Sequence, residues 1–230
     1  MMRISRYIIS FVVLLSVLRM QYTPAMCNEQ DTTRIYINPM KGIRIGVDFS
    51  KFLYPFIYNW ERTGFEATAD MHIKKNLFGA VEAGWLYINL NRTDYLYKQY
   101  GFYGKFGIDY NLLKQKVPGS NDILYGGVRY GFSTFNQQAE QITITSHYWQ
   151  DATGQTIPLT FMTSHWLEFL LGVKAEVLKN FYVGMSFRLK FRVIKPKDDF
   201  STPYMIPGYG NGNASTAIGI NYCLSYNLHF

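Results

Sequence analysis

The sequence predicts an all-β fold, an eight-stranded antiparallel up-and-down transmembrane β-barrel with short periplasmic turns and long external loops. Three observations predict it. Eight segments alternate between apolar and polar or small residues, the connections between them alternate between short and long, and the charged residues collect on one face of the segments.

Residues 1–27 have the organisation of an export signal. Arg3 and Arg6 precede an apolar run, Tyr7–Leu18, which is followed by polar and small residues. A basic start, an apolar core of roughly a dozen residues and a cleavage zone are typical of a secretory signal peptide. A spanning helix needs about 20 apolar residues, so a retained anchor is the weaker alternative. Whether Cys27 is lipidated or removed with the signal stays open.

The composition fits one exported domain. We expect residues 28–41 to be a periplasmic lead-in and residues 42–230 to form the barrel. The formal charge of +7 falls to +4 without the signal, because 23 − 3 = 20 basic residues then face 16 acidic ones. This excess is too small to indicate nucleic acid binding. With only Cys27 and Cys223, the chain has no disulfide framework, and no spacing predicts a metal or a cofactor.

The alternating segments have the length of tilted membrane strands, which need about 9–11 residues. Ile43, Ile45 and Val47, for example, alternate with Arg44, Gly46 and Asp48. The eight segments are residues 43–50, 65–72, 80–87, 102–110, 124–132, 167–177, 181–192 and 218–230. Alternation alone shows only half-buried strands, and a soluble sandwich or barrel would show it too.

The connections favour the membrane barrel over the soluble one. The short links are residues 74–76 and 178–180, with a modest one at 113–122; the long links are residues 51–64, 89–99, 136–164 and 195–213. Outer-membrane barrels have tight periplasmic turns and long external loops in this order. The longest loop contains two extended arms, Gln141–Trp149 and Thr156–Met162, which predict a protruding ribbon. The alternative is that the arms are two further membrane strands, giving ten.

Charged residues lie on the face opposite the bulky apolar one. They are Arg44, Asp48, Glu66, Asp70, Glu82, Lys105, Asp109, Arg129, Glu168, Lys174, Glu176, Arg188, Lys190 and Arg192. In a soluble barrel this face would be the core, where an unpaired charge costs several kcal/mol. A membrane barrel inverts the arrangement, and eight strands enclose only enough room for side chains. We therefore expect a lumen ionic network that plugs the barrel, in preference to an ion path or a catalytic carboxylate pair.

Aromatic residues crowd the predicted strand ends and indicate interfacial girdles. They are Phe52, Tyr54, Phe56, Tyr58, Trp60, Tyr95, Tyr97, Trp166 and Phe181. The last segment also alternates apolar residues up to a terminal aromatic: Tyr222, Leu224, Tyr226, Leu228 and Phe230. This series resembles the terminal strand signal that the barrel assembly machinery recognises, which makes that machinery an expected partner during biogenesis.

Catalytic signatures are weak. No His-X-Ser or Asp-Ser pair of the known lipid-modifying barrels occurs around His72, His147, His165 or His229. Asp198-Asp199 is similar to the acidic pair of barrel proteases, but a solvated charge pair in a loop is the simpler interpretation. We therefore expect no enzyme.

Several segments resemble an uncharacterised family. They are Gly42–Asp48, Tyr125–Ser133, His165–Glu168 and Ile206–Gly210. The family is a domain of unknown function found in Bacteroidota and regarded as outer-membrane barrels. The resemblance implies fold and location but no activity; in architecture the chain is also similar to small eight-stranded barrels with a protruding external sheet.

The resulting hypothesis is an integral outer-membrane barrel, with a plugged lumen, that acts as a structural or surface-interaction protein through its external loops. Its partners would be outer-membrane lipid, an external protein or glycan ligand, or other subunits of an outer-membrane complex. The alternatives are a rim-active lipid-modifying enzyme and a narrow passive channel.

Overall fold

The computed structural model describes residues 42–74, 76–113, 122–144, 152–194 and 202–228. The elements are β1 Ile43–Asp48, α2 Phe49–Phe52, α3 Tyr54–Ile57, β2 Arg62–Lys74, β3 Leu77–Asn91, β4 Leu96–Asn111, β5 Ile123–Ile144, β6 Ala152–Leu178, β7 Phe181–Ile194, β8 Met205–Ile206, β9 Gly210–Asn211 and β10 Thr216–Leu228. The predicted export signal, Cys27 and the lead-in lie outside the described residues.

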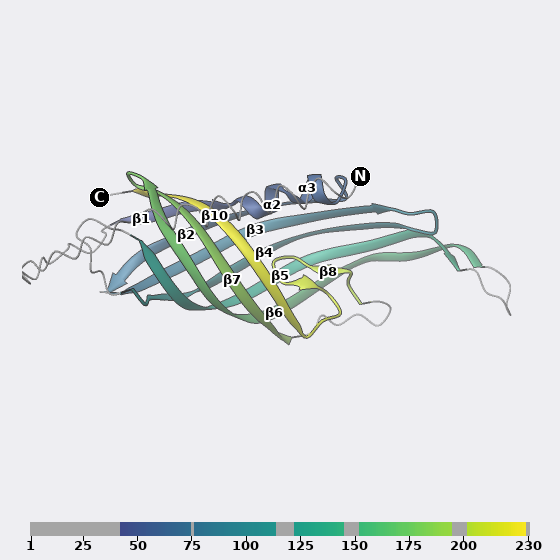
Figure 1. Ribbon diagram of the computed structural model, residues 1–230. Coiled ribbons are helices and arrows are strands. Elements are labelled where there is room, and N and C mark those ends of the chain that lie inside the picture. The colour runs from purple at the N-terminus through teal and green to yellow at the C-terminus, as the bar shows by residue number, and fades with distance from the viewer. Residues whose placement is uncertain (1–41, 75, 114–121, 145–151, 195–201, 229–230) are drawn as a thin grey trace, which may run out of the picture. The chain divides into compact units, whose positions relative to one another are not determined.

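Eight of the strands close into one barrel in the order β1-β10-β7-β6-β5-β4-β3-β2 (Figure 1). Every neighbouring pair is antiparallel. Strand β1 closes the ring by pairing with β10 on one side and β2 on the other. This confirms the predicted eight-stranded up-and-down barrel over the ten-stranded alternative.

Beyond Glu140, where the pairing of β5 with β4 ends, strands β5 and β6 continue as a two-stranded ribbon, at the right in Figure 1. They have 22 and 27 residues, whereas an apolar band about 25 Å tall needs about 10 tilted residues. The register shifts between Gln137 and Ala139, and again further out. The ribbon is thus an extension of two barrel strands, as the patterned arms predict; its tip lies outside the described residues.

Strand β1 is shorter than the sequence pattern predicts. We expected the first strand to reach Ser50, but it ends at Asp48 and α2 begins at Phe49. The Asp48 carboxylate accepts hydrogen bonds from the Ser50 backbone N–H at 2.9 Å and from its hydroxyl at 2.6 Å. An aspartate in this position caps a helix and so competes with a continuing strand. Helices α2 and α3 then follow the barrel wall in line with β1 (Figure 1).

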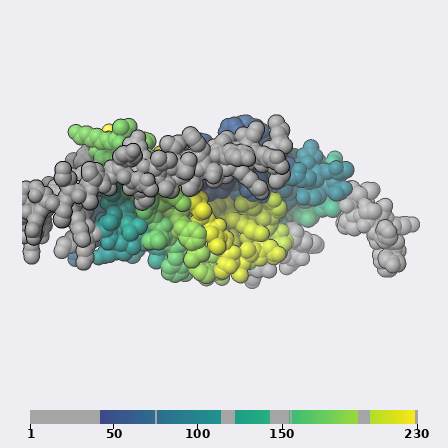
Figure 2. Space-filling model, in the orientation of Figure 1, coloured from purple at the N-terminus to yellow at the C-terminus, as the bar shows by residue number. Residues whose placement is uncertain are grey.

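The two faces of the wall have opposite chemistry. Charged side chains such as Glu66, Lys105 and Glu168 are buried inside, whereas Phe106, Leu171 and their neighbours are exposed outside. Figure 2 shows part of this outer surface, with β7 in green beside β10 in yellow. Among the described residues, no helix is long and apolar enough to cross a membrane.

The interior divides into a charged part and an apolar part. The apolar part is a cluster of Tyr103, Phe135, Met162, Trp166, Ile206 and Tyr209. Ile206 and Tyr209 belong to the short β8–β9 hairpin, so part of the last long loop folds inward and fills this part of the barrel. Trp166 was predicted to lie in an outer girdle and this is wrong, because its side chain is fully buried inside.

Tyr97 corrects the girdle prediction in the same way. Its hydroxyl hydrogen-bonds to Gln99 at 3.1 Å and to Gln137 at 3.0 Å, and its ring packs against the cluster of Leu86, Ile88 and Leu90. Alternation sets which face a residue occupies, and both aromatics share the inward phase of their strands. Strand phase therefore decides the face of Trp166 and Tyr97, and residue type does not.

Candidate functional site in the barrel lumen

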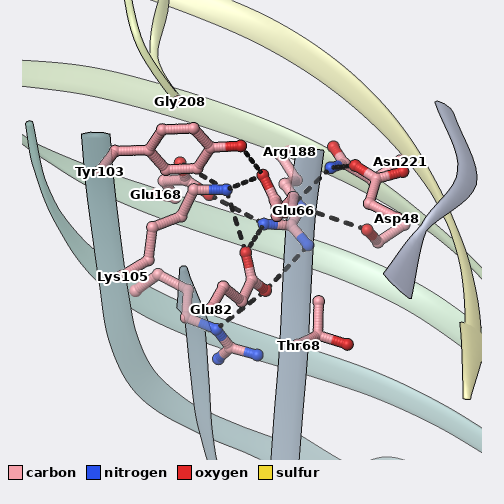
Figure 3. Close-up of polar contacts among 12 residues, drawn as sticks. Asp48, Glu66, Thr68, Glu82, Tyr103, Lys105, Glu168, Arg188, Gly208 and Asn221 are labelled. Carbon is pink, nitrogen blue, oxygen red and sulfur yellow. Dashed lines mark hydrogen bonds and ion pairs between the residues drawn. The ribbon is translucent and has the colours of Figure 1, made fainter. Parts of the chain in front are cut away.

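The centre of the lumen is an ionic network around Glu82 (Figure 3). The Arg188 guanidinium donates to both carboxylate oxygens, at 2.5 and 3.0 Å. Lys105 Nζ donates to the same carboxylate at 3.0 Å, and Arg129 Nε lies 3.6 Å away. Strands β3, β4, β5 and β7 supply these four side chains, so the network ties together strands that are not all neighbours.

Glu66 on β2 forms a second centre beside the first. Its carboxylate accepts from the Tyr103 hydroxyl at 2.6 Å and from Lys105 Nζ at 3.1 Å (Figure 3). Asn221 donates to Asp48, and its amide lies 3.5 Å from Glu66. The two centres therefore share Lys105 as a bridge.

Two further groups continue the network toward the short turns. Asp70 binds Arg44 at 2.6 Å and also accepts from Lys174. Arg129 forms a bidentate pair with Asp109, at 2.7 Å for both contacts. Each carboxylate is thus held by at least one cation, which is what burial of charge requires.

Glu168 connects the ionic part to the apolar part. Its carboxylate accepts from the Trp166 indole N–H at 2.7 Å and from Arg188 at 3.3 Å, and it lies 3.8 Å from Lys190 Nζ. Lys190 in turn donates to the Gly208 carbonyl at 2.6 Å and to the Tyr209 carbonyl at 3.2 Å. One lysine therefore joins the charge network to the inward-folded hairpin.

The hairpin is held at other points too. Gln99 donates to the Met205 carbonyl, and Arg192 donates to the Gly212 carbonyl at 2.5 Å. The Tyr209 hydroxyl donates to Ala214 at 3.1 Å. Polar side chains of the wall thus satisfy the loop carbonyls that burial would leave unpaired.

Of the fourteen charged residues predicted to face the lumen, twelve take part in ion pairs. They are Arg44, Asp48, Glu66, Asp70, Glu82, Lys105, Asp109, Arg129, Glu168, Lys174, Arg188 and Lys190. Glu176 lies at the short β6–β7 turn, where it accepts from the Asn180 backbone N–H at 2.7 Å. Arg192 binds the hairpin carbonyl and lies over the Tyr209 ring.

Sequence reasoning missed four members of the site: Lys51, Tyr103, Trp166 and Asn221. Lys51 was assigned to a loop, but α2 places it 3.8 Å from Asp48. The other three occupy inward positions of their strands and bind carboxylates. Their strand phase was readable from the sequence; the helix at Lys51 was signalled only by the capping aspartate.

The carboxylates of the network are engaged by cations. Within the described ranges, no group of three His, Cys, Asp or Glu residues is placed to hold a metal ion. Of the histidines considered, His165 lies next to Tyr130, with 2.8 Å between Nδ1 and the hydroxyl. His147, Asp198, Asp199 and His229 lie outside the described residues.

The predicted assembly signal falls on β10. Tyr222, Tyr226 and Leu228 are exposed on the outer face, and Leu224 is half-buried on the same face. Phe230 lies outside the described residues. Recognition of this strand by assembly machinery stays a prediction.

Fold and lumen together define a closed eight-stranded β-barrel of inverted polarity, apolar outside and charged inside. The chain belongs to the family described as "Domain of unknown function (DUF6048)", which matches residues 4–230. Among solved structures, it is similar to the crystal structure of Neisserial surface protein A (NspA), with a TM-score of 0.36 and 11% identity over 81% of this chain and 94% of that chain. None of the curated proteins matches. The Bacteroidota origin stays a prediction.

Proposed function

We propose that the protein is an integral outer-membrane barrel with a plugged lumen, which acts as a structural or surface-interaction protein and not as an enzyme. One observation carries the membrane assignment: the outer face is apolar, while the interior contains the ion pairs. In water this polarity would expose a wide apolar belt and bury charge, both at a cost. In a bilayer the same belt faces lipid.

The filled lumen supports a structural role over a passive channel. Ions would have to pass the paired carboxylates of Glu66, Glu82 and Glu168 and then the apolar cluster around Tyr209. Paired charges occupy the first layer and apolar side chains occupy the second. This is the usual state of eight-stranded barrels, whose interiors side chains fill.

The ribbon supports an interaction role on the outside of the cell. It continues β5 and β6 beyond Glu140, where the pairing of β5 with β4 ends. Next to it, past the last β6 residue that pairs with β7, strand β6 carries exposed apolar residues such as Leu159 and Phe161. A two-stranded ribbon has free edges, which pair readily with a strand of another protein. We propose that the partner of the ribbon is an external protein or glycan, or another subunit of an outer-membrane complex. The chain would contact the barrel assembly machinery only during biogenesis.

The membrane assignment is tested by placing the same charge at two matched positions of β6. Leu171 is 54% exposed in the middle of the apolar belt, and Leu159 is 52% exposed toward the ribbon, past the last β6 residue that pairs with β7. Twelve residues separate them, roughly 40 Å along the strand and roughly 30 Å along the membrane normal at the usual tilt. We expect Leu171→Arg to destabilise the vesicle-inserted barrel by about 2–4 kcal/mol, the cost of arginine at the midplane.

Leu159→Arg is the control and should have little effect, because Leu159 lies beyond the band. The measurement is urea unfolding in lipid vesicles, followed by the different gel mobility of unheated and boiled protein. Equal, small effects at both positions, or a barrel that stays folded and monomeric without detergent or lipid, would show that the outer face does not meet hydrocarbon.

A further inference from the structure

The barrel wall is incomplete over part of its height, between β2 and β10. Strand β1 ends at Asp48. Its last residue paired with β10 is Asp48, opposite Cys223, and its last residue paired with β2 is Val47, opposite Ala67. Beyond these points, and among the residues that the structure describes, Thr216–Tyr222 of β10 pair with β7 alone, and Arg62–Glu66 of β2 pair with β3 alone. We call this gap between the two strand edges the seam.

Helix α2 takes the place of the missing strand. It contacts both β10 and β2, and Phe52 packs edge-on against Phe65 with ring centroids 5.8 Å apart. A helix cannot continue the strand ladder, so it covers the seam without sealing it as a strand would. In hydrocarbon, an unpaired edge is tolerated only where it is covered by protein or lines a polar cavity.

Such a cavity lies behind the helix. Its volume is about 290 Å³, and it is lined both by lipid-facing residues of the wall and by interior residues. Trp85, Ile218 and Ile220 represent the first group, and Tyr103 and Lys190 the second. Glycines 208, 210 and 219 line it as well, leaving space that side chains would fill. The cavity therefore connects the lumen with the outer face through the seam.

The charge of this cavity has one sign. Lys51, Arg62 and Lys190 line it, and none of its lining residues, within the part of the chain described, is acidic. Arg62 donates to the Tyr204 hydroxyl at 2.6 Å and lies over the Tyr58 ring at 4.1 Å. These neutral partners leave the guanidinium charge without a carboxylate among the described residues.

Lys51 is the second cation near the opening. Its ammonium donates to the Tyr54 hydroxyl at 3.1 Å and lies 3.8 Å from the Asp48 carboxylate. Asp48 does not line the cavity, so Lys51, Arg62 and Lys190 set the charge of its lining among the described residues.

We propose that the seam cavity binds the phosphate-bearing head group of an acidic lipid from the surrounding leaflet. Lys51 and Arg62 would hold the phosphate oxygens, and the acyl chains would lie on the outer wall beside Ile218, which is 70% exposed, and Ile220. Basic pockets of membrane proteins bind acidic head groups in this way. A volume close to the lower limit of small-molecule sites, about 300 Å³, fits a head group and excludes a folded segment of protein.

This inference rests on the proposed membrane location, and the test separates the two. Barrel purified in neutral detergent is incubated with phosphatidylglycerol, phosphatidylethanolamine or inorganic phosphate, and retained molecules are counted by native mass spectrometry. We expect one phosphatidylglycerol to be retained in preference to phosphatidylethanolamine. Gel mobility of unheated against boiled protein reports separately whether the barrel is folded.

Two variants test the site itself. The double variant Lys51→Gln with Arg62→Gln should weaken retention of phosphatidylglycerol by roughly tenfold for each charge removed. This is the affinity usually lost with one hydrogen bond to a charged group. Gly219→Leu keeps both charges but fills the cavity; a Cβ there meets Lys190 Cε at an ordinary 3.4 Å, so the fold should tolerate it. The matched control is Arg92→Gln with Lys98→Gln, which removes the same charges outside the cavity.

Four results would overturn the proposal while leaving the barrel intact. They are equal retention of both lipids, unchanged retention in both cavity variants, an equal loss in the control, and displacement of the lipid by inorganic phosphate at similar concentration. A polypeptide retained in place of lipid would overturn it too, and would indicate strand pairing at the seam. Loss of heat-modifiable mobility in the wild-type protein would instead count against the proposed membrane barrel.

Discussion

Replacing Arg188 by glutamine tests whether the lumen network holds the barrel together. The guanidinium contacts Glu82 at 2.5 and 3.0 Å and Glu168 at 3.3 Å, and the paired side chains of Arg188 and Glu82 are 6% and 4% exposed. After Arg188→Gln, Lys105 at 3.0 Å and Arg129 at 3.6 Å remain near Glu82. They cannot replace the bidentate contact from the other side of the lumen.

The expected loss of stability is about 3–5 kcal/mol, since removing one partner of a buried pair leaves the other charge uncompensated. The protein contains a matched control. Arg92 and Glu61 form the same bidentate contact, at 2.6 and 2.9 Å, but their side chains are 48% and 27% exposed. Arg92→Gln should cost far less, because water and salt screen an exposed pair.

The assay is equilibrium unfolding by urea in lipid vesicles, with the unheated gel mobility as the readout of folded barrel. The double variant Arg188→Gln with Glu82→Gln should recover part of the loss, because it removes the orphaned carboxylate. Similar small losses for Arg188→Gln and Arg92→Gln would refute the reasoning, as would a double variant less stable than the sum of its single changes.

Two further predictions concern the inward-folded hairpin and its contacts. Gly208→Ala should loosen the hairpin, because Gly208 has φ +76° and a Cβ there would lie 2.5 Å from the Tyr103 ring. Gly154→Ala is the control: Gly154 has φ +80° but open space around it, so this change costs only the backbone strain of a positive φ, about 1–2 kcal/mol. Limited proteolysis of residues 202–212 should then be faster in the first variant only. Trp166→Phe removes the donor to Glu168 and should lower stability by about 1–3 kcal/mol, measured as heat-modifiable mobility against temperature; an unchanged midpoint would show that the indole N–H contributes nothing.

The barrel could be predicted from the sequence because its pattern repeats. Alternation with a period of two assigns each residue to a face, and one face of each strand contains the charges. Lys105 and Glu168 were assigned to the lumen on this basis, and the structure places both in ion pairs. The closing of eight strands followed from the same pattern and from the alternating loop lengths.

The site could be predicted only in part, because its partners come from strands far apart in the sequence. Phase alone shows that Glu66 and Lys105 face inward, but not that Lys105 bridges Glu66 and Glu82. The inward fold of the β8–β9 hairpin depends on contacts to Tyr103 and Lys190 that no local pattern encodes. Long loops follow tertiary contacts more than local propensity, so their path is the least predictable feature.

The charged layer and the hairpin stabilise each other through Lys190. Its ammonium sits between Glu168 on one side and the carbonyls of Gly208 and Tyr209 on the other. If the hairpin moved out of the lumen, Lys190 would lose two hydrogen-bond acceptors and the two loop carbonyls would lose their donor. The apolar cluster around Tyr209 would also be exposed. Opening the lumen would therefore require both layers to change together, which supports the proposed plugged barrel over the passive channel.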